Sequence, residues 1–238
     1  MVSSAMMNKQ KLFSSCVKAF DRWLCLPKWT AFDKVLERAA SYSDDFFFIQ
    51  VGANDGVVHD PLYRHVVENN WSGILVEPVR HYFDRLMNNY RSNKNLIFAN
   101  VAISDKEEVR EFYRIKEGQD HLPAWSKGLG SFYLDVLLKH KWAIPDIEQH
   151  IVNEKVQCCS FASLLKAHHV EKVDLLLVDT EGYDFEILKQ IDFNQLKPTT
   201  IVYEHKHLSK ENRKNCEALL KDQGYCLTRR FSNTMACL

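Results

Sequence analysis

The feature that most constrains the fold is a run of six residues at 46–51, FFFIQV, which is almost entirely apolar and is followed by a glycine. A short apolar run that stops at a glycine is typical of a strand buried on both faces of a parallel sheet. Similar runs follow at 74–78 and 96–103, and segments with helical spacing lie between them near 61–69 and 82–89. This β-α-β-α-β order predicts a doubly wound α/β fold.

The first of these helices has a marked beginning. Asp60 and Pro61 suit its N-cap and its first position, because an Asp side chain accepts from free backbone N–H groups and proline fixes a helical φ. The alternation of helix and strand resumes in the second half of the chain, over 160–168, 173–178, 183–191, 200–203 and 209–220. The last two segments, 225–230 and 234–238, are expected to pair as a closing antiparallel hairpin.

Residues 116–157 interrupt this rhythm. They mix glycine and proline with aromatic residues, which are Trp125, Phe132, Tyr133 and Trp142. A long irregular insert in a compact domain is usually functional, so we expect it to form a lid or a wall of a substrate pocket. We therefore expect one domain over 46–238, preceded by a helical extension over 1–45.

The helical extension carries an apolar face over 10–24, which predicts a helix packed on the domain or closing over its ligand. A membrane-surface helix is the alternative, and its polar face is not basic enough to favour it. No apolar run approaches the roughly 18 residues that a membrane span needs, and charged residues interrupt any signal-peptide core.

Charge and cysteine content bound the partners and the compartment. Lys+Arg and Asp+Glu both number 31, and this balance gives no basic excess of the kind that nucleic-acid binding requires. Seven cysteines are scattered without zinc-ligand spacing. An odd, scattered set predicts reduced thiols in a cytoplasmic protein. The charge balance predicts that nucleic acid is not its partner.

Every predicted strand end offers small, polar or acidic residues. They are Gly52, Ala53, Asn54, Asp55 and Gly56 after the first strand, Glu77 and Pro78 after the second, Asn100, Val101 and Ala102 from the third, Asp179 to Gly182 after the fourth, and Glu204 and His205 after the fifth. In doubly wound sheets, ligands bind outside the carboxyl ends of the strands. The binding site is therefore predicted at these residues.

The residues of the first two strand ends indicate the kind of cofactor. Gly52 and Gly56 let the backbone turn tightly beside a ligand, and Glu77 is placed to accept hydrogen bonds from a ribose diol. Asn54 stands where a pyrophosphate-binding G-x-G-x-x-G loop would place its second glycine, and there is no G-x-x-x-x-G-K-[ST] loop. An adenosine cofactor without phosphates fits this pattern, which points to S-adenosylmethionine.

Five sequence blocks occur in the order and spacing of a known family, and the chain resembles the FkbM family of methyltransferases. The blocks are 50–56 (QVGANDG), 75–78 (LVEP), 100–104 (NVAIS), 174–182 (DLLLVDTEG) and 201–204 (IVYE). The resemblance implies a Rossmann-like, mostly parallel seven-stranded sheet of the class I methyltransferase type with a C-terminal antiparallel hairpin. It also implies S-adenosylmethionine as methyl donor and, usually, O-methylation of a sugar or another small hydroxylated molecule.

The same resemblance extends the expected cofactor site. The expected site includes Gln50, where the family commonly has Asp. One contact at the amino-acid end of the cofactor is therefore expected to differ from that of the family. The expected cofactor-binding residues are Gln50, Gly52, Ala53, Asn54, Asp55, Gly56, Glu77, Pro78, Asn100, Val101, Ala102 and Asp179.

Methyl transfer to a hydroxyl needs a base for the hydroxyl proton, and four residues at the later strand ends are candidates. They are Asp179, Glu181, Glu204 and His205, with His121 and His150 of the insert as weaker ones. A purely structural role at the strand end is the alternative for Asp179. The same four residues could hold a hard divalent ion, but their spacing matches no stringent metal motif, so no metal is expected.

The nature of the acceptor stays open at this level. The expected partner is a small-molecule or glycan substrate that is methylated on a hydroxyl. N-methylation, methylation of a protein or lipid-linked acceptor, and a cofactor-binding but inactive module are the alternatives.

Overall fold

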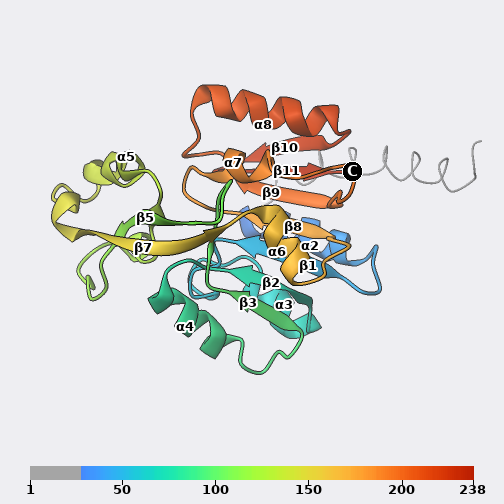
Figure 1. Ribbon diagram of the computed structural model, residues 1–238, viewed down its shortest axis with the longest axis horizontal. Helices are drawn as coiled ribbons and strands as arrows, with labels where there is room; N and C mark the ends of the chain where they lie inside the picture. Colours follow the sequence, from blue (N-terminus) through green and yellow to red (C-terminus); the bar gives the residue numbers. More distant parts are fainter. Residues whose placement is uncertain (1–27) are drawn as a thin grey trace, which may run out of the picture.

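The larger sheet of the molecule has seven strands in the order β10-β11-β9-β8-β1-β2-β3 (Figure 1). The computed structural model describes residues 28–238, so the helix predicted at 10–24 lies outside the described residues. Neighbouring strands are parallel except at β11, which runs antiparallel to both β9 and β10. The strands are Phe47–Val51 (β1), Ser72–Val76 (β2), Leu96–Ala99 (β3), Leu175–Val178 (β8), Thr200–Glu204 (β9), Cys226–Arg230 (β10) and Asn233–Cys237 (β11).

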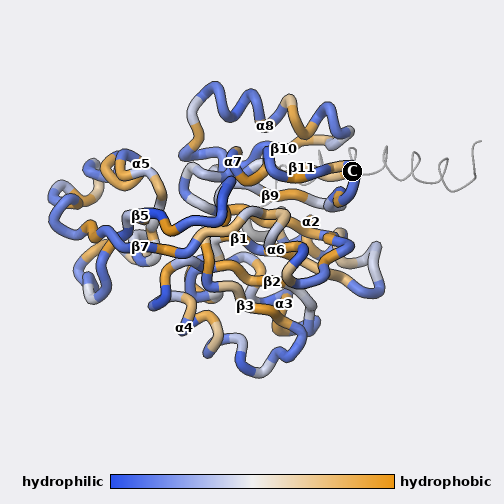
Figure 2. The backbone as a smooth tube through the Cα atoms, in the orientation of Figure 1, coloured by the Kyte–Doolittle hydropathy of each residue, from blue (hydrophilic) through white to orange (hydrophobic). Residues whose placement is uncertain are grey.

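Helices cover both faces of this sheet. They are α2 (Lys28–Ala40), α3 (Tyr63–Asn69), α4 (Arg80–Asn89), α6 (Phe161–Ala167), α7 (Asp184–Leu188) and α8 (Lys210–Asp222). Ile49 and Val51 of β1 pack in a core cluster with α6, α7 and α8, whereas Phe48 packs in a second cluster with α2, α3 and α4. Because both faces are buried, the strands read as continuous apolar runs (Figure 2).

The segment between β3 and α6 forms a second, smaller sheet in the order β4-β7-β5-β6. Its strands are Ala102–Ile103 (β4), Glu108–Ile115 (β5), Gly130–Ser131 (β6) and Ile151–Cys159 (β7). The long antiparallel pair β5 and β7 extends away from the larger sheet and ends beside α5 (Leu134–Leu138) (Figure 1). The segment between β5 and β7 also contains three short 3₁₀ helices, namely Ala124–Ser126 (η1), Lys139–Trp142 (η2) and Ile147–His150 (η3).

The predicted fold class is confirmed, with three local corrections. The predicted strand at 96–103 is two strands in different sheets, because Asn100 Nδ2 donates to the carbonyl oxygens of Glu77 and Pro78 and turns the chain between them. The end of the insert is not irregular, since it forms β7. The helix after Asp60 begins at Tyr63, because the Asp60 carboxylate caps a turn by accepting from the Leu62 N–H.

Two further observations concern the described residues. Cys158, Cys159 and Cys216 are free thiols. Among helices within 28–238, we find none with both the length and the apolar character that crossing a membrane requires.

Candidate active site

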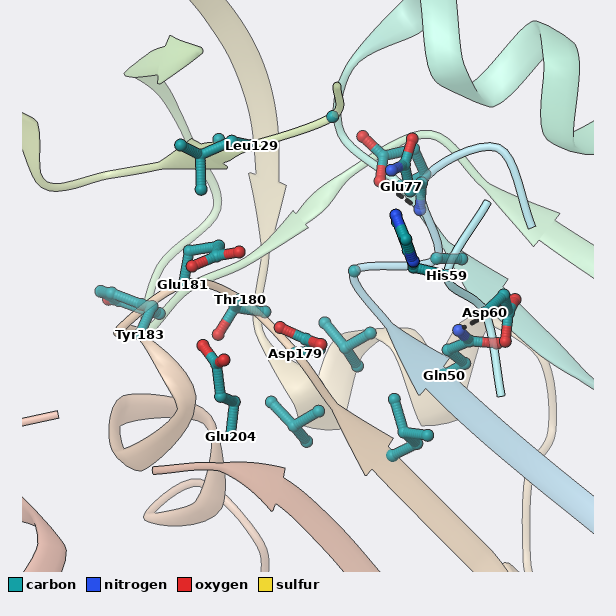
Figure 3. Close-up of a pocket in the computed structure, with 18 of the residues that line it drawn as sticks. Gln50, His59, Asp60, Glu77, Leu129, Asp179, Thr180, Glu181, Tyr183 and Glu204 are labelled. Carbon is teal, nitrogen blue, oxygen red and sulfur yellow. Dashed lines mark hydrogen bonds between the residues drawn. The ribbon is translucent and has the colours of Figure 1, made fainter. Parts of the chain in front are cut away.

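A cavity of about 380 Å³ lies at the carboxyl ends of β1, β2, β8 and β9. Figure 3 shows Gln50, Asp60 and Glu77 on one side of it and Glu181, Tyr183 and Glu204 on the other, with Asp179 and Thr180 between them. The cavity therefore has two acidic sides, which are built from different strand ends.

The turn after β1 requires glycine at position 52. The N–H groups of Gly52 and Ala53 both donate to the Val76 carbonyl, so the turn folds back over the end of β2. Gly52 has a φ of +84°, and a Cβ there would lie 1.9 Å from the backbone oxygen of Asp179. The close approach of this turn to the end of β8 is what brings the two sides into one cavity.

Glu77 follows β2 and is 6% exposed. Its Oε2 accepts from the Asn54 N–H and its Oε1 accepts from the Val79 N–H, both at 2.8 Å. Burial nevertheless raises the pKa of Glu77 to about 7, against the lowering effect of these two bonds. Each oxygen keeps a second lone pair, so this carboxylate is held in place while it can still accept from a ligand.

Gln50 lies deeper on the same side and is 3% exposed. Its Nε2 donates to Asp60 Oδ2 at 3.3 Å, whereas its Oε1 has no hydrogen-bond partner among the described residues. Burial raises the pKa of Asp60 to about 7. A buried amide oxygen without a donor marks a place where a ligand donor would be accommodated.

Carboxyl groups gather on the opposite side of the cavity. Asp179, Glu181 and Glu204 all line it, and Figure 3 shows their carboxyl groups directed toward a common space. Asp184 lies beneath them and joins the segments, since it accepts from the Thr180 hydroxyl at 3.0 Å and from the Glu204 N–H at 3.0 Å. The Ser131 hydroxyl donates to the Glu181 carbonyl at 2.7 Å, which ties the second sheet to this loop.

Burial and mutual repulsion alter the acid–base properties of this group. Burial, followed by the nearby negative charge of Asp179, raises the pKa of Glu181 and of Glu204. The same two causes raise the pKa of Asp184 to about 7. Burial and then the neighbouring Lys206 lower the pKa of His207 to about 3, so its imidazole is neutral at physiological pH.

Aromatic residues of the insert form a further wall of the cavity. Trp125 and Phe132 line the cavity, and Phe132 meets Tyr183 edge-on with ring centroids 5.0 Å apart. His140 also lines it, 4% exposed, with its ring centroid 4.9 Å from that of Trp125. Neither ring nitrogen of His140 has a hydrogen-bond partner among the described residues.

The comparison with protein families settles the class of protein. A model described as the methyltransferase FkbM domain matches residues 50–227. The chain belongs to the FkbM methyltransferase family. A comparison with curated proteins finds no match.

The fold of a solved FkbM methyltransferase agrees with this assignment. The FkbM methyltransferase of Methylobacillus flagellatus KT is 12% identical with a TM-score of 0.52, over 82% of this chain and 44% of that one. The precorrin-6y C5,15-methyltransferase of Geobacter metallireducens GS-15 is 14% identical with a TM-score of 0.42, over 86% of both chains. The methyltransferase domain of METTL16 is 12% identical with a TM-score of 0.46, over 89% of this chain and 68% of that one.

Family membership makes this chain an S-adenosylmethionine-dependent methyltransferase. The residues at the β1–β2 side of the cavity fit that cofactor. The fixed carboxylate of Glu77 and the unpartnered amide oxygen of Gln50 are acceptors, and the cofactor carries a ribose diol and an ammonium group as donors. No phosphate-binding loop competes with this fit.

The structure brings most of the predicted cofactor residues to the cavity. Those that line it are Gln50, Gly52, Ala53, Asn54, Glu77, Pro78, Val101, Ala102 and Asp179. Three others are not among the lining residues. Asp55 accepts from the N–H groups of Val57 and Val58, and a Cβ at Gly56 would lie 2.5 Å from Leu86. Asn100 turns the chain after β3.

Among the predicted catalytic residues, His205 is the one that does not line the cavity. Its Nδ1 lies 3.0 Å from the Thr234 hydroxyl, and its N–H donates to the Ser232 carbonyl. Strand geometry explains this, because successive side chains point to opposite faces and Glu204 occupies the cavity face. His121 and His150 pair with each other in the insert, with ring centroids 5.3 Å apart, and neither lines the cavity.

Two histidines and a lysine at the site were not among the predicted catalytic residues. His207 lies beside Glu181 and Glu204, while Lys206 and His140 line the cavity. Alternation along β9 could have excluded His205, but the turn that brings His207 back to Glu181 and Glu204 leaves no periodic signal. His140 comes from the insert, where no regular pattern fixes which side chains point inward.

Proposed function

We propose that this enzyme transfers a methyl group to a hydroxyl of a sugar, a glycan or another small hydroxylated molecule. The observation that carries the proposal is the set of three carboxyl groups, Asp179, Glu181 and Glu204, which line the same cavity as Glu77 but at its other side. A hydroxyl acceptor must lose a proton as it is methylated, and carboxylates beside it can take that proton.

The β1–β2 side is proposed to hold the cofactor. Glu77 would accept from the ribose hydroxyls, and Gln50 Oε1 would accept from the amino-acid end. The N–H groups of Gly52 and Ala53 already donate to the Val76 carbonyl, so they are not free to bind the cofactor. The backbone of these two residues would instead form the floor of the cofactor site. When it is bound, S-adenosylmethionine supplies a methyl group that is activated by its positively charged sulfur.

The β8–β9 side is proposed to hold the acceptor. Asp179 stands between the two sides, so it is the residue best placed to orient the hydroxyl and take its proton (Figure 3). Glu181 and Glu204 line the same space, where burial and the negative charge of Asp179 raise the pKa of both. Alignment of acceptor and donor supplies much of the rate in such a reaction, since no further activation of the methyl group is needed.

The aromatic wall supports a sugar-like acceptor. Trp125 and Phe132 contribute apolar ring surface to the cavity lining, and His140 offers two ring nitrogens without partners among the described residues. A sugar ring presents an apolar face together with hydroxyl groups, so both kinds of contact would be used at once.

Asp179→Asn tests the assignment. We expect the single-turnover rate of methyl transfer to fall by about 10²–10⁴-fold, the range for loss of a general base, while affinity for S-adenosylhomocysteine stays within a few-fold. Mass spectrometry of a panel of sugars and small hydroxylated metabolites identifies the acceptor by the gain of one methyl. Titration calorimetry and thermal melting on the same variant separate catalysis from binding and folding.

Asp222→Asn is the matched control, because it removes an exposed carboxylate from the end of α8. It should turn over like the natural protein. A folded Asp179→Asn variant with near-normal turnover would remove Asp179 from the mechanism. A methyl group found on a nitrogen of the product would overturn the proposed hydroxyl acceptor.

A further inference from the structure

Three metal-ligating atoms meet at the β8–β9 side of the cavity. His207 Nε2 lies 3.0 Å from Glu181 Oε2 and 3.8 Å from Glu204 Oε2. The three atoms all lie within 4.8 Å of one another. They come from the loop after β8, the last residue of β9 and the turn beyond it, so the fold and not a single motif brings them together.

Glu204 enters this cluster without a hydrogen-bond donor on its buried oxygen. The residue is 7% exposed, and its Oε2 is buried and receives no hydrogen bond from any described residue. Lys206 lines the cavity, yet no ion pair joins it to either glutamate within the described part of the chain. A buried carboxylate oxygen that the protein leaves without a donor is costly unless a ligand completes it.

A second unpartnered side chain faces the same place. The ring centroid of His140 lies 5.4 Å from that of His207, and His140 is 4% exposed. Both of its ring nitrogens lack partners among residues 28–238. Because His140 belongs to the insert, a different part of the chain also places an unsatisfied polar group beside the cluster.

We infer that Glu181, Glu204 and His207 form a binding site for a first-row divalent cation. Ligand bonds of about 2.0–2.2 Å place neighbouring ligand atoms about 3–3.5 Å apart, and the distances of 3.0 and 3.8 Å need only a small adjustment. Two carboxylates with one imidazole suit Mn²⁺ or Zn²⁺, whereas Mg²⁺ and Ca²⁺ prefer oxygen ligands throughout.

The role of this site in catalysis rests on the proposed function. Three protein ligands leave at least one coordination position free, as catalytic metal sites require. A cation there would face the space assigned to the acceptor, where its positive charge would attract and orient a hydroxyl oxygen. Asp179, which also lines this space, would then remain available for the proton.

Metal binding can be measured without any methyl acceptor. We expect the full chain, freed of metal with EDTA and then dialysed, to bind one Mn²⁺, seen as loss of the free-ion signal in electron paramagnetic resonance. Zn²⁺ should compete for it. Removal of an outer-shell partner alone costs about 10–100-fold in metal affinity, so Glu204→Gln and His207→Gln should each weaken Mn²⁺ binding by at least about tenfold.

Glu211→Gln is the control, since it removes an exposed glutamate from the first turn of α8. It should bind Mn²⁺ like the natural protein. Glu181→Gln serves as a further test variant if either buried substitution lowers the melting temperature, because the Glu181 side chain is 25% exposed.

The outcomes separate this inference from the proposed function. Absence of saturable Mn²⁺ and Zn²⁺ binding, or equal binding in the three cluster variants, would overturn the metal site while leaving hydroxyl methylation to its own assay. Binding that depends on the cluster in a protein that methylates no hydroxyl would support the site and contradict the proposed function instead.

Discussion

Two buried glutamates face each other across the cavity, and the fold treats them differently. Glu77 ends the β2 side and Glu204 ends β9, and burial raises the pKa of both. Both oxygens of Glu77 accept backbone N–H groups at 2.8 Å, whereas Oε2 of Glu204 receives no hydrogen bond among the described residues. The protein backbone therefore supplies hydrogen bonds to both oxygens of Glu77, but it supplies none to Oε2 of Glu204.

The difference indicates two kinds of binding site. A carboxylate that is fixed by the backbone presents its remaining lone pairs in a constant direction. This suits a cofactor that binds in the same way in every catalytic cycle. A buried carboxyl group that lies beside other carboxyl groups is destabilised in its ionised form until a ligand binds to it. Such a group suits the binding of an acceptor or a cation. The comparison can therefore be tested by removing each glutamate in turn.

The largest contrast is expected in cofactor affinity. Glu77→Ala should weaken S-adenosylhomocysteine binding by about a hundredfold or more, because it removes two charge-assisted bonds worth roughly 1.5–3 kcal/mol each. Glu204→Ala should change the same dissociation constant by no more than about threefold, because Glu204 lies on the acceptor side. Titration calorimetry on both variants checks the pair.

Equal losses in the two alanine variants would mean that the sides of the cavity do not have separate roles. An unchanged dissociation constant in a folded Glu77→Ala variant would place the ribose elsewhere. Far-ultraviolet circular dichroism shows whether each variant is folded before its affinity is interpreted.

The next contrast concerns stability, where glutamine substitutions should act in opposite senses. Glu77→Gln leaves one backbone N–H facing an amide nitrogen that cannot accept, which should cost about 1–3 kcal/mol. Glu204→Gln removes no accepted hydrogen bond at Oε2 and lessens repulsion with Asp179 and Glu181. Its free energy of unfolding should be unchanged or higher by about 1 kcal/mol.

Thermal melting in the presence of EDTA measures this second contrast. For a domain of this size, 1 kcal/mol corresponds to about 2–4 °C in Tm, so the two variants should differ visibly. Destabilisation of similar size in both would show that Glu204 has a structural partner equivalent to those of Glu77.

These glutamates also show how far the sequence predicts the site. Glu77 and Glu204 could be placed because each follows an apolar run, and parallel strands bring their carboxyl ends to one edge of the sheet. The sheet itself could be predicted for the same reason, since the burial of both faces is visible in the composition of each strand.

The rest of the site depends on contacts that are distant in sequence. His207 reaches Glu181 only because a turn reverses the chain after β9, and His140 arrives from the second sheet. The split between β3 and β4 depends on Asn100, whose side-chain bonds to Glu77 and Pro78 redirect a run that is apolar throughout. Periodicity reports which face is buried, and it carries no information about such turns.

The smallest expected effect is the pH dependence of the Glu77 side. Burial raises the pKa of Glu77 to about 7, and Asp55 and Glu154 act in the same direction. A raised carboxyl pKa means that the folded protein holds the proton more tightly than the unfolded chain, so the contribution of this group to stability is full below pH 4.5 and is lost as the pH rises toward 7.

Cofactor binding should respond in the opposite sense, because the ionised carboxylate is the stronger acceptor for ribose hydroxyls. We expect affinity for S-adenosylhomocysteine to increase by about three- to tenfold between pH 6 and pH 8, since one unit of pKa change on binding equals 1.36 kcal/mol. Burial also raises the pKa of Asp60, which accepts from Gln50, to about 7, so its ionisation adds to the pH dependence over the same range.

Glu77→Gln separates the two groups, because any pH dependence that survives in this variant belongs to Asp60. If the full dependence survives, ionisation of Glu77 is not what the cofactor senses, and the fixed geometry of its carboxyl group would be sufficient for binding.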